Sequence, residues 1–258
     1  MKKLFLILTV VLLVVCPVFC LGSSENGKNA DNTLTIATSP DFPPFESLNN
    51  GKPEGIEIDI LDLICKELGK ELKIEQMDFD SVLPGVQAGK YDVGVSGISI
   101  TEQRKKNVLF TEPYCLAAQA IVVPEKSKIK SKADLDGKKV SVQSGTTAES
   151  FCMANGYDVS SYAANSDAEA AVVSGKVDAW VIDDLTAADM VKVYNASAGV
   201  KLVILDEAMT SEPYAFAFKK GNDTLVAQVN SVLVKLVSDG TVAKIFEKYD
   251  APYTSPVK

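Results

Sequence analysis

The chain has 258 residues, and its 34 acidic and 26 basic side chains leave a formal net charge of −8. An acidic balance of this kind argues against a nucleic acid as partner. The sequence contains no histidine, which excludes Ser-His-Asp and Cys-His catalysis and removes the commonest metal ligand. We therefore expect a protein that is not an enzyme and needs neither a metal nor a cofactor.

The N-terminus begins with two lysines after Met1 and continues as an apolar run over residues 4–15. This pattern predicts a secretory signal, because the run is too short to span a bilayer comfortably. Cys20 resembles the lipid-attachment cysteine of bacterial lipoproteins, although the residues before it match the usual pattern poorly. We expect a lipoprotein-type signal peptide over 1–20, lipid attachment at Cys20 and a flexible tether over 21–33. An uncleaved anchor is the alternative.

The folded part opens with alternating apolar residues at 34–38, which predict a strand. A loop with three prolines follows at 39–46 and holds Phe42 and Phe45 in a stiff extended geometry. We expect Phe45 in the core and Phe42 at a binding site. Residues 55–68 place their apolar side chains near one face and predict an amphipathic helix.

Residues 72–77 predict a second strand and residues 82–88 a short helix, with Phe79 between them at the strand end. The stretch 91–104, which reads YDVGVSGISITEQR, predicts a half-buried strand that leads into a helix capped by Thr101. Alternating strands and helices predict a parallel sheet covered by helices. Ligands of such sheets bind at the carboxyl ends of the strands.

The stretch 91–104 carries small residues and two hydroxyls shortly before Arg104. Arginine can bind both oxygens of a carboxylate at once, so this combination favours a receptor for a small carboxylate. A capped turn followed by a solvated basic run is an equally good interpretation of this stretch alone.

Residues 115–123 predict an apolar strand that passes from one lobe to another. The strand–helix pattern then starts again at 139–142. Hydroxyls at 143–147 precede a helix N-terminus, whose free amides attract anions. An ordinary capped helix over 148–155 is the alternative for this segment.

A further strand is predicted at 177–182. We expect Asp183, at its end, to face a cleft and bind a cation, and Asp184 to cap the next helix. The segment SEPY at 211–214 echoes TEPY at 111–114, and each precedes an apolar strand. This repetition predicts two crossovers between two lobes.

The C-terminal part, residues 223–249, has apolar residues at helical spacing and is expected to return to the first lobe. The three cysteines of the mature chain are Cys65, Cys115 and Cys152. Neither their number nor their spacing indicates a metal site or a disulfide framework. One pair could bridge in an oxidising compartment, and the sequence does not select it.

Seven segments together carry a family resemblance: ATSPDFPPFE, GIEIDIL, MDFDSVLPGVQAGKYD, GISITEQR, VQSGTTAE, GKVDAWVIDD and DGTVAKIFEKY. From about residue 34 to 249 the chain resembles the extracytoplasmic solute-binding proteins of polar amino-acid ABC importers, which include glutamine- and histidine-binding proteins. The resemblance implies an α/β, two-lobed clamp of the type II periplasmic-binding-protein kind. Each lobe would be a mainly parallel sheet flanked by helices, with two hinge crossovers. Lobe 1 would comprise 34–115 plus 215–258, and lobe 2 would comprise 116–214.

The resemblance also implies a site for one α-amino acid, with the ligand-binding residues Phe42, Phe79, Ser96, Gly97, Ser99, Arg104, Gln143, Thr147 and Asp183. Arg104 would bind the α-carboxylate, helped by Ser99 and the amide of Thr147. Gln143 would face the ligand side chain or the carboxylate from the second lobe.

For the other end of the ligand, the resemblance implies that Asp183 binds the α-ammonium together with Ser96 and Gly97. Phe42 and Phe79 would sandwich the ligand side chain between their rings. A zwitterion removed from water needs both charges paired, so two opposite charges in one cleft agree with this interpretation.

Three departures from the family bear on the ligand. Ser39 stands where many members carry an aspartate that contacts the ligand side chain, and whether neighbouring Asp41 compensates stays open. Gln143 is neutral where some members have lysine, and Ile182 is apolar where some have a polar residue. These departures suggest a polar, uncharged ligand such as glutamine or cysteine.

We accordingly expect a monomeric binding protein that delivers an amino acid to an ABC permease by hinge closure. It would work in the periplasm or at the extracytoplasmic face of a bacterial membrane, held there by its lipid anchor. One alternative is a ligand-sensing module for a receptor. The other is a dehydratase-type enzyme on the same fold, which without histidine would depend on Glu46, Asp80 or Asp183.

Overall fold

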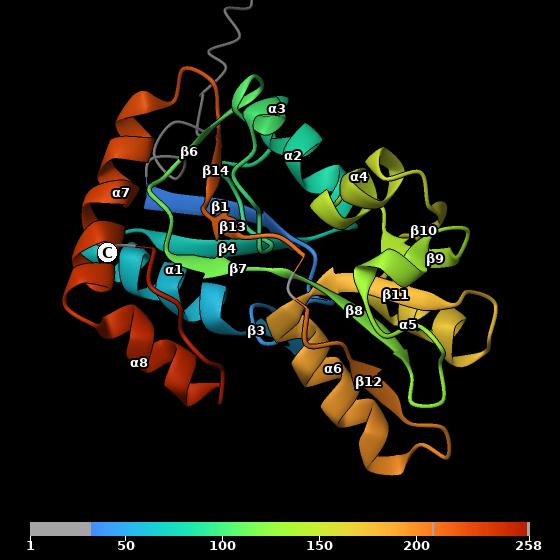
Figure 1. Ribbon diagram of the computed structural model, residues 1–258. Helices are drawn as coiled ribbons and strands as arrows, with labels where there is room; N and C mark the ends of the chain where they lie inside the picture. Colours follow the sequence, from blue (N-terminus) through green and yellow to red (C-terminus); the bar gives the residue numbers. More distant parts are fainter. Residues whose placement is uncertain (1–31, 208, 257–258) are drawn as a thin grey trace, which may run out of the picture. The chain divides into compact units, whose positions relative to one another are not determined.

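The computed structural model describes residues 32–207 and 209–256 (Figure 1). The predicted signal peptide, most of the tether and Cys20 lie outside the described residues. The described chain contains two five-stranded sheets, each of which forms the centre of a lobe. The first sheet has the order β4 (Glu71–Gln76), β1 (Thr33–Thr38), β5 (Val93–Gly94), β14 (Ala217–Lys219) and β6 (Val108–Phe110).

The second lobe is built on a sheet with the same plan. Its order is β10 (Asp158–Tyr162), β9 (Lys139–Gln143), β11 (Ala179–Asp183), β8 (Gln119–Pro124) and β12 (Leu202–Ile204). Two short strands, β7 (Cys115–Ala117) and β13 (Glu212–Tyr214), pair antiparallel where the chain crosses between the lobes. The two predicted crossovers are therefore present, and the two-lobed α/β clamp is confirmed.

Each sheet combines parallel and antiparallel pairs. In the first sheet β1 pairs parallel with β4 and β5, whereas β14 pairs antiparallel with β5 and β6. In the second, β9 pairs parallel with β10 and β11, whereas β8 pairs antiparallel with β11 and β12. Strands β8 and β14 each follow a crossover. The neighbouring strands have their carboxyl ends at the edge of the sheet that faces the crossovers. A strand that enters the sheet from a crossover starts at this edge and therefore runs antiparallel to them.

Helices cover both faces of each sheet, and β1 shows how the sequence divides them. Ile36 packs into the core with α1 (Ile56–Leu68), α7 (Asp223–Ser238) and α8 (Thr241–Lys248), and Ala37 packs into the core with α2 (Phe79–Gln87). Successive side chains of a strand point to opposite faces, so adjacent residues serve different layers. In the second lobe α5 (Asn165–Val173) and α6 (Asp184–Ser197) cover one face and α4 (Thr147–Ala154) the other.

Several boundaries differ from those predicted. Helix α2 begins at Phe79, earlier than the predicted start at 82, so Phe79 is the first helical residue. The apolar strand predicted at 115–123 is divided into β7 and β8. The helical C-terminal part breaks at Gly240, whose φ of 81° separates α7 from α8. The hairpin of β2 (Ser47–Asn49) and β3 (Lys52–Glu54), strand β10 and the 3-10 helix η2 (Lys132–Leu135) were not predicted.

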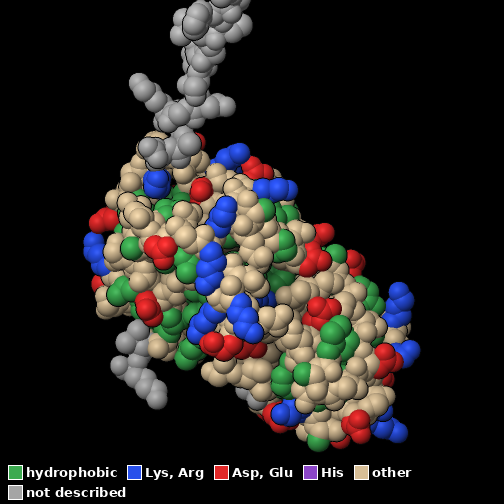
Figure 2. Space-filling view, turned by 90° about the horizontal axis from the view of Figure 1, so that it is seen from above, with side chains coloured by type: hydrophobic (Ala, Val, Ile, Leu, Met, Phe, Trp, Pro, Cys, Tyr) green, Lys and Arg blue, Asp and Glu red, His purple; other side chains and the backbone are tan. Residues whose placement is uncertain are grey.

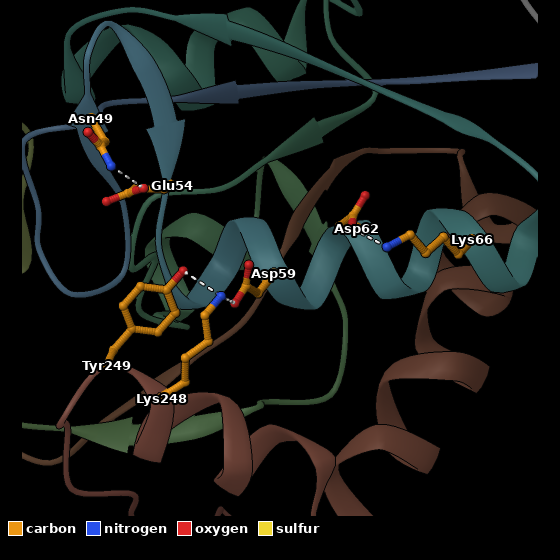
Figure 3. A network of polar contacts seen from close by, with 7 residues as sticks. All are labelled: Asn49, Glu54, Asp59, Asp62, Lys66, Lys248 and Tyr249. Atoms are coloured by element: carbon orange, nitrogen blue, oxygen red, sulfur yellow. Dashed lines mark hydrogen bonds and ion pairs between the residues drawn. The ribbon is translucent and has the colours of Figure 1, made fainter.

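Ion pairs lie on helices α1 and α8 of the first lobe (Figure 3). The Lys248 ammonium lies 2.6 Å from a carboxylate oxygen of Asp59 and so joins α8 to α1. Within α1, Lys66 and Asp62 form an i,i+4 pair at 2.5 Å. Because these groups are largely exposed, they contribute little to stability. Basic and acidic side chains also both appear across the face seen from above in Figure 2.

Cys65, Cys115 and Cys152 are buried and free, so these three form no disulfide with one another. Burial raises the pKa of the Cys65 thiol to about 11 and that of Cys152 to about 12. All three therefore behave as small core residues. Within residues 32–207 and 209–256, no helix has the length and apolar character needed to cross a membrane.

Candidate functional site

The nine residues predicted to bind a ligand line one cavity, together with Thr146. They come from the loop after β1, the start of α2, the turn after β5, the short helix α3 (Glu102–Lys105), the end of β9, the start of α4 and the end of β11. The carboxyl edges of both sheets thus meet at the cavity, as expected for such sheets. Its volume is about 10 Å³, room for about one water molecule.

Arg104 lies on α3 and lines this cavity. The predicted cap is confirmed, because the Thr101 hydroxyl accepts a hydrogen bond from the Arg104 amide at 3.1 Å. The guanidinium donates to the carbonyls of Ser99 at 3.0 Å and Gly145 at 3.1 Å, and its central carbon lies 5.7 Å from the ring centre of Phe79. It forms no ion pair with any residue the structure describes. A positive charge held by neutral carbonyls is suited to an anion.

Asp183 supplies a buried carboxylate on the other side of the cavity. It is the last residue of β11, and one carboxylate oxygen accepts hydrogen bonds from the Gln119 amide at 2.9 Å and from the Tyr214 hydroxyl. Burial, with the nearby charge of Glu212, raises the pKa of Asp183 to about 7 against the opposing effect of these hydrogen bonds. The expectation that Asp183 faces the cleft agrees with its place in the cavity wall.

The predicted role of Asp184 as helix cap is wrong in position. Strand β11 extends to Asp183, which occupies the N-cap of α6, while Asp184 is the first helical residue. Its carboxylate accepts hydrogen bonds from the backbone amides of Leu185 at 2.9 Å and Ala118 at 3.3 Å. It therefore connects the start of α6 to the residue that precedes β8. The side chain of Asp183 caps nothing and is directed to the cavity instead.

The turn after β5 differs most from its prediction. The expected half-buried strand has only two residues, and residues 93–99 are all buried. Gly97, three residues after the strand, has a φ of 53°, and a Cβ there would lie 2.4 Å from the Phe42 ring. The Ser96 hydroxyl donates to a carboxylate oxygen of Glu46 at 2.7 Å, and the Gly97 amide donates to Glu57 at 3.0 Å. Two buried carboxylates therefore accept hydrogen bonds from this turn and fix its position.

Neither acid was predicted as part of the binding site, and Glu46 was named only for the dehydratase alternative. Glu57, the second residue of α1, also accepts from the Tyr114 hydroxyl at 2.5 Å. Burial raises the pKa of Glu46 well above its usual range, and the neighbouring carboxyl of Glu57 raises it further. Both lie in segments recognised by motif, but only the folded chain brings them under Ser96 and Gly97.

Phe45 lies in the core as predicted, but Phe42 packs into the same hydrophobic cluster and is therefore a core residue that also lines the cavity. Phe45 is fully buried, and its ring stacks on Phe42 with 5.5 Å between ring centres. Phe42 lines the cavity from the loop after β1, and Phe79 lines it from α2. A second cavity of about 410 Å³ lies between α2, α3 and α4. Phe79 and Arg104 line both cavities and so stand between them.

Asp41 connects the two lobes beside Gln143, which lines the cavity. Its carboxylate accepts from the Ser39 hydroxyl at 2.9 Å, from the Gln143 amide at 3.1 Å and from the Asn165 backbone amide at 2.8 Å. The Asn165 side chain donates to the side-chain amide oxygen of Gln143 at 3.1 Å. The carboxylate of Asp41 thus lies directly beside Ser39. Asn165, at the start of α5, was missed because residues 156–166 carry no motif.

The family model described as bacterial extracellular solute-binding proteins, family 3, matches residues 34–251. The putative ABC transporter arginine-binding protein 2 of Escherichia coli K12 is 30% identical over 223 residues, which are 85% of this chain and 91% of that protein.

Two solved structures are also similar. An ancestral arginine-binding protein bound to glutamine is 42% identical, with a TM-score of 0.79, over 86% of this chain and 99% of its own. The ancestral amino acid-binding protein AncCDT-1, a precursor of cyclohexadienyl dehydratase, is 36% identical, with a TM-score of 0.78, over 85% and 96%. Since the family model covers most of the chain, this protein belongs to the bacterial extracellular solute-binding proteins, family 3.

Proposed function

We propose that this protein binds one polar α-amino acid between its lobes and delivers it to an ABC permease by hinge closure. The observation that carries the proposal is the meeting of Arg104, Asp183, Phe42 and Phe79 around one cavity, with contributions from both sheets. A zwitterion needs a cation for its carboxylate and an anion for its ammonium, because an unpaired buried charge is very costly.

Each end of the ligand has a partner in this arrangement. Arg104 would bind the α-carboxylate with the amides at the start of α4, including that of Thr147. Asp183 would bind the α-ammonium, with the carbonyl and hydroxyl groups of the turn at Ser96 and Gly97. The rings of Phe42 and Phe79 would enclose the ligand side chain.

Two classes of side chain are candidates. Neutral groups at Ser39 and Gln143 favour the polar, uncharged amino acid that the sequence suggests, glutamine above all. A basic amino acid is the second candidate, because the Asp41 carboxylate is held only by neutral donors and has no cationic partner among the described residues. A guanidinium would supply that partner.

The setting of the protein is part of the proposal. It would act outside the cytoplasmic membrane as a monomer, held there through lipid attached at Cys20. Its lobes would be residues 34–115 plus 215–258 and residues 116–214. Its role would be binding without catalysis, so we expect no turnover of prephenate-like acids. A ligand-sensing role would need the same cavity and is distinguished by whether a permease uses the protein for import.

A thermal-shift screen against the twenty amino acids tests the proposed function. A ligand at a thousand times its Kd should stabilise the protein by about 4 kcal/mol, which raises the Tm by several degrees. We expect the largest shifts with L-glutamine or L-arginine, and which of the two dominates decides between the candidates. If no amino acid raises the Tm, the proposal is wrong.

Replacement of Arg104 tests the carboxylate site. Arg104→Ala should abolish the shift, and Arg104→Lys should restore it only in part, because lysine cannot bind both carboxylate oxygens in one plane. Lys105→Ala is the matched control, since its exposed ammonium pairs only with Glu102 on the same helix. Isothermal titration calorimetry on the three variants would give the Kd values. Binding by Arg104→Ala equal to that of the wild type would remove Arg104 from the site.

A further inference from the structure

We propose that Glu212 is a positioning residue of the amino-acid site. Its carboxylate takes the hydroxyl protons of Ser99 and Thr147, so that both hydroxyls offer lone pairs to the ligand. These hydroxyls then serve the α-ammonium end of the ligand and not its carboxylate. The inference rests on the proposed function and adds a residue that lies outside both the segments of the family resemblance and the cavity lining.

The geometry centres on one oxygen atom. The Ser99 hydroxyl donates to Oε2 of Glu212 at 2.5 Å, and the Thr147 hydroxyl donates to the same oxygen at 2.7 Å. The other oxygen, Oε1, accepts from the Thr210 hydroxyl at 2.9 Å. Glu212 is 8% exposed, so this carboxylate has little access to water. Three hydroxyls from three segments therefore satisfy it.

The number of protons and lone pairs on a hydroxyl determines which end of the ligand it can bind. A serine or threonine hydroxyl has one proton to donate and two lone pairs that accept. When the proton of Ser99 is donated to Glu212, only lone pairs remain for the cavity. Thr147 is in the same position, and its oxygen already accepts from the Gln119 amide at 3.3 Å. Lone pairs attract an ammonium and repel a carboxylate.

The neighbouring side chains also favour the ligand ammonium beside these two hydroxyls. Gln119 also donates to Asp183 at 2.9 Å, so the acid expected at the α-ammonium and the Thr147 hydroxyl share one amide group. Glu212 and Asp183 both lie near Arg104 and both raise the pKa of its guanidinium against the lowering effect of burial. The ligand carboxylate is left to Arg104 and to backbone amides.

Glu212 also has a particular place in the fold. It lies on β13, one of the strands that cross between the lobes, whereas Ser99 follows β5 in the first lobe and Thr147 opens α4 in the second. The crossover is held beside the turn after β5, because the Ile100 amide donates to the Pro213 carbonyl at 2.9 Å. A hinge residue thus orients a hydroxyl from each lobe.

The test compares ligands that lack one end. L-glutamine is compared with glutaramic acid, which has no ammonium, and with 4-aminobutanamide, which has no carboxylate. L-arginine is compared in the same way with 5-guanidinopentanoic acid and agmatine. For each variant, competition calorimetry gives the Kd of the analogue without ammonium and the Kd of the analogue without carboxylate, and the ratio of these two values is compared. In Glu212→Gln the new amide can donate a hydrogen bond to one of the two hydroxyls, whose own proton is then free to be donated to the ligand. The affinity for the analogue without ammonium, relative to the analogue without carboxylate, should therefore rise about tenfold.

The control is Glu112→Gln in the other E-P-Y segment. It makes the same charge change at an exposed position whose side chain lies outside this network, and its ratio should equal that of the wild type. A second control separates orientation from charge. In a Ser99→Ala/Thr147→Val background the hydroxyls are gone, so adding Glu212→Gln should leave the ratio unchanged. Thermal melts of all variants check folding.

The outcomes separate the two proposals. If the wild type binds no amino acid, the proposed function fails and this inference with it. If the wild type binds but Glu212→Gln leaves the ratio unchanged, or shifts it equally without the two hydroxyls, only this inference is overturned. A crystal structure of the wild-type complex adds a direct reading. A ligand carboxylate oxygen that accepts from the Ser99 or Thr147 hydroxyl would also overturn it.

Discussion

Asp183 shows how a single buried residue can tie ligand binding to pH. Its carboxyl is surrounded by apolar core, two hydrogen-bond donors and the charge of Glu212, and its pKa is raised to about 7. The other charged or titratable groups near it are Asp184 on α6, Arg104 on α3, Cys115 on β7 and Tyr214 on β13. A ligand ammonium binds only the ionised form strongly. Below the raised pKa, binding must therefore release a proton.

We predict that affinity for the amino acid rises with pH from about 5 to 7 and levels off above 7. The slope should approach, and not exceed, about tenfold per pH unit, the value for loss of one proton on binding. Calorimetry at several pH values, in buffers of different ionisation enthalpy, measures both the affinity and the protons released. Asp183→Asn should bind weakly and without this slope. A wild-type Kd that is constant over this range would contradict the prediction.

At the scale of elements, the turn after β5 is the part of the site that depends most on its neighbours. Gly97 combines a φ of 53° with a position directly under the Phe42 ring. On its other side the turn is bound by β13, through an isolated bridge between Ser99 and Tyr214. Packing on both sides leaves room for a glycine only. The turn therefore determines where Phe42 and the neighbouring serines lie.

Gly97→Ala should lower stability by about 1–3 kcal/mol and weaken ligand binding at least about tenfold, because the new methyl group displaces the Phe42 ring. Gly137→Ala is the matched control, with a φ of 66° and no atom within 4 Å of the added carbon. It shares the backbone strain and lacks the clash. Urea denaturation and calorimetry measure the two effects. Equal losses in both variants would assign the whole effect to backbone strain.

For the whole molecule, the contacts that cross between the lobes decide how closely the lobes approach. Arg104 donates to the Gly145 carbonyl, and Asp41 accepts from Gln143 and Asn165. Gly145 is a close contact point, because a Cβ on it would lie 3.0 Å from Cβ and 3.2 Å from Cα of Asp80 in the other lobe. A small addition at this point acts on closure while the cores of both lobes stay unchanged.

Gly145→Ala should therefore weaken ligand binding and leave the complex more open, with a larger radius of gyration in small-angle X-ray scattering than the wild-type complex. Gly156→Ala, in the same lobe with a φ of 76° and free space around the added carbon, is the control for backbone strain. The two variants should have similar stability without ligand. If Gly145→Ala closes and binds as the control does, contact with Asp80 does not limit closure.

Local sequence signals account for much of the fold and for the predicted residues of the site. Strand ends, caps and small residues placed Phe42, Phe79 and Arg104 at corresponding positions of successive strand–helix units, and the motifs added the second lobe. These features depend on a few neighbouring residues, which is why they can be read without a structure. The predicted residues do line one cavity, and their roles toward a ligand remain a prediction.

Tertiary structure alone decided the polar partners of that cavity. Ser99 and Glu212 are 113 positions apart, and Asp41 and Asn165 are 124 apart, so no periodicity or spacing links them. Tertiary packing also makes β5 shorter than predicted. The alternation of residues predicts a longer strand, but the segment after Gly94 forms a turn that packs against β13 and the Phe42 ring. The sequence by itself determined the family, the clamp and the candidate residues, since these follow from local pattern and motif. Which hydroxyl donates to which acid depends on segments that meet only in the folded chain.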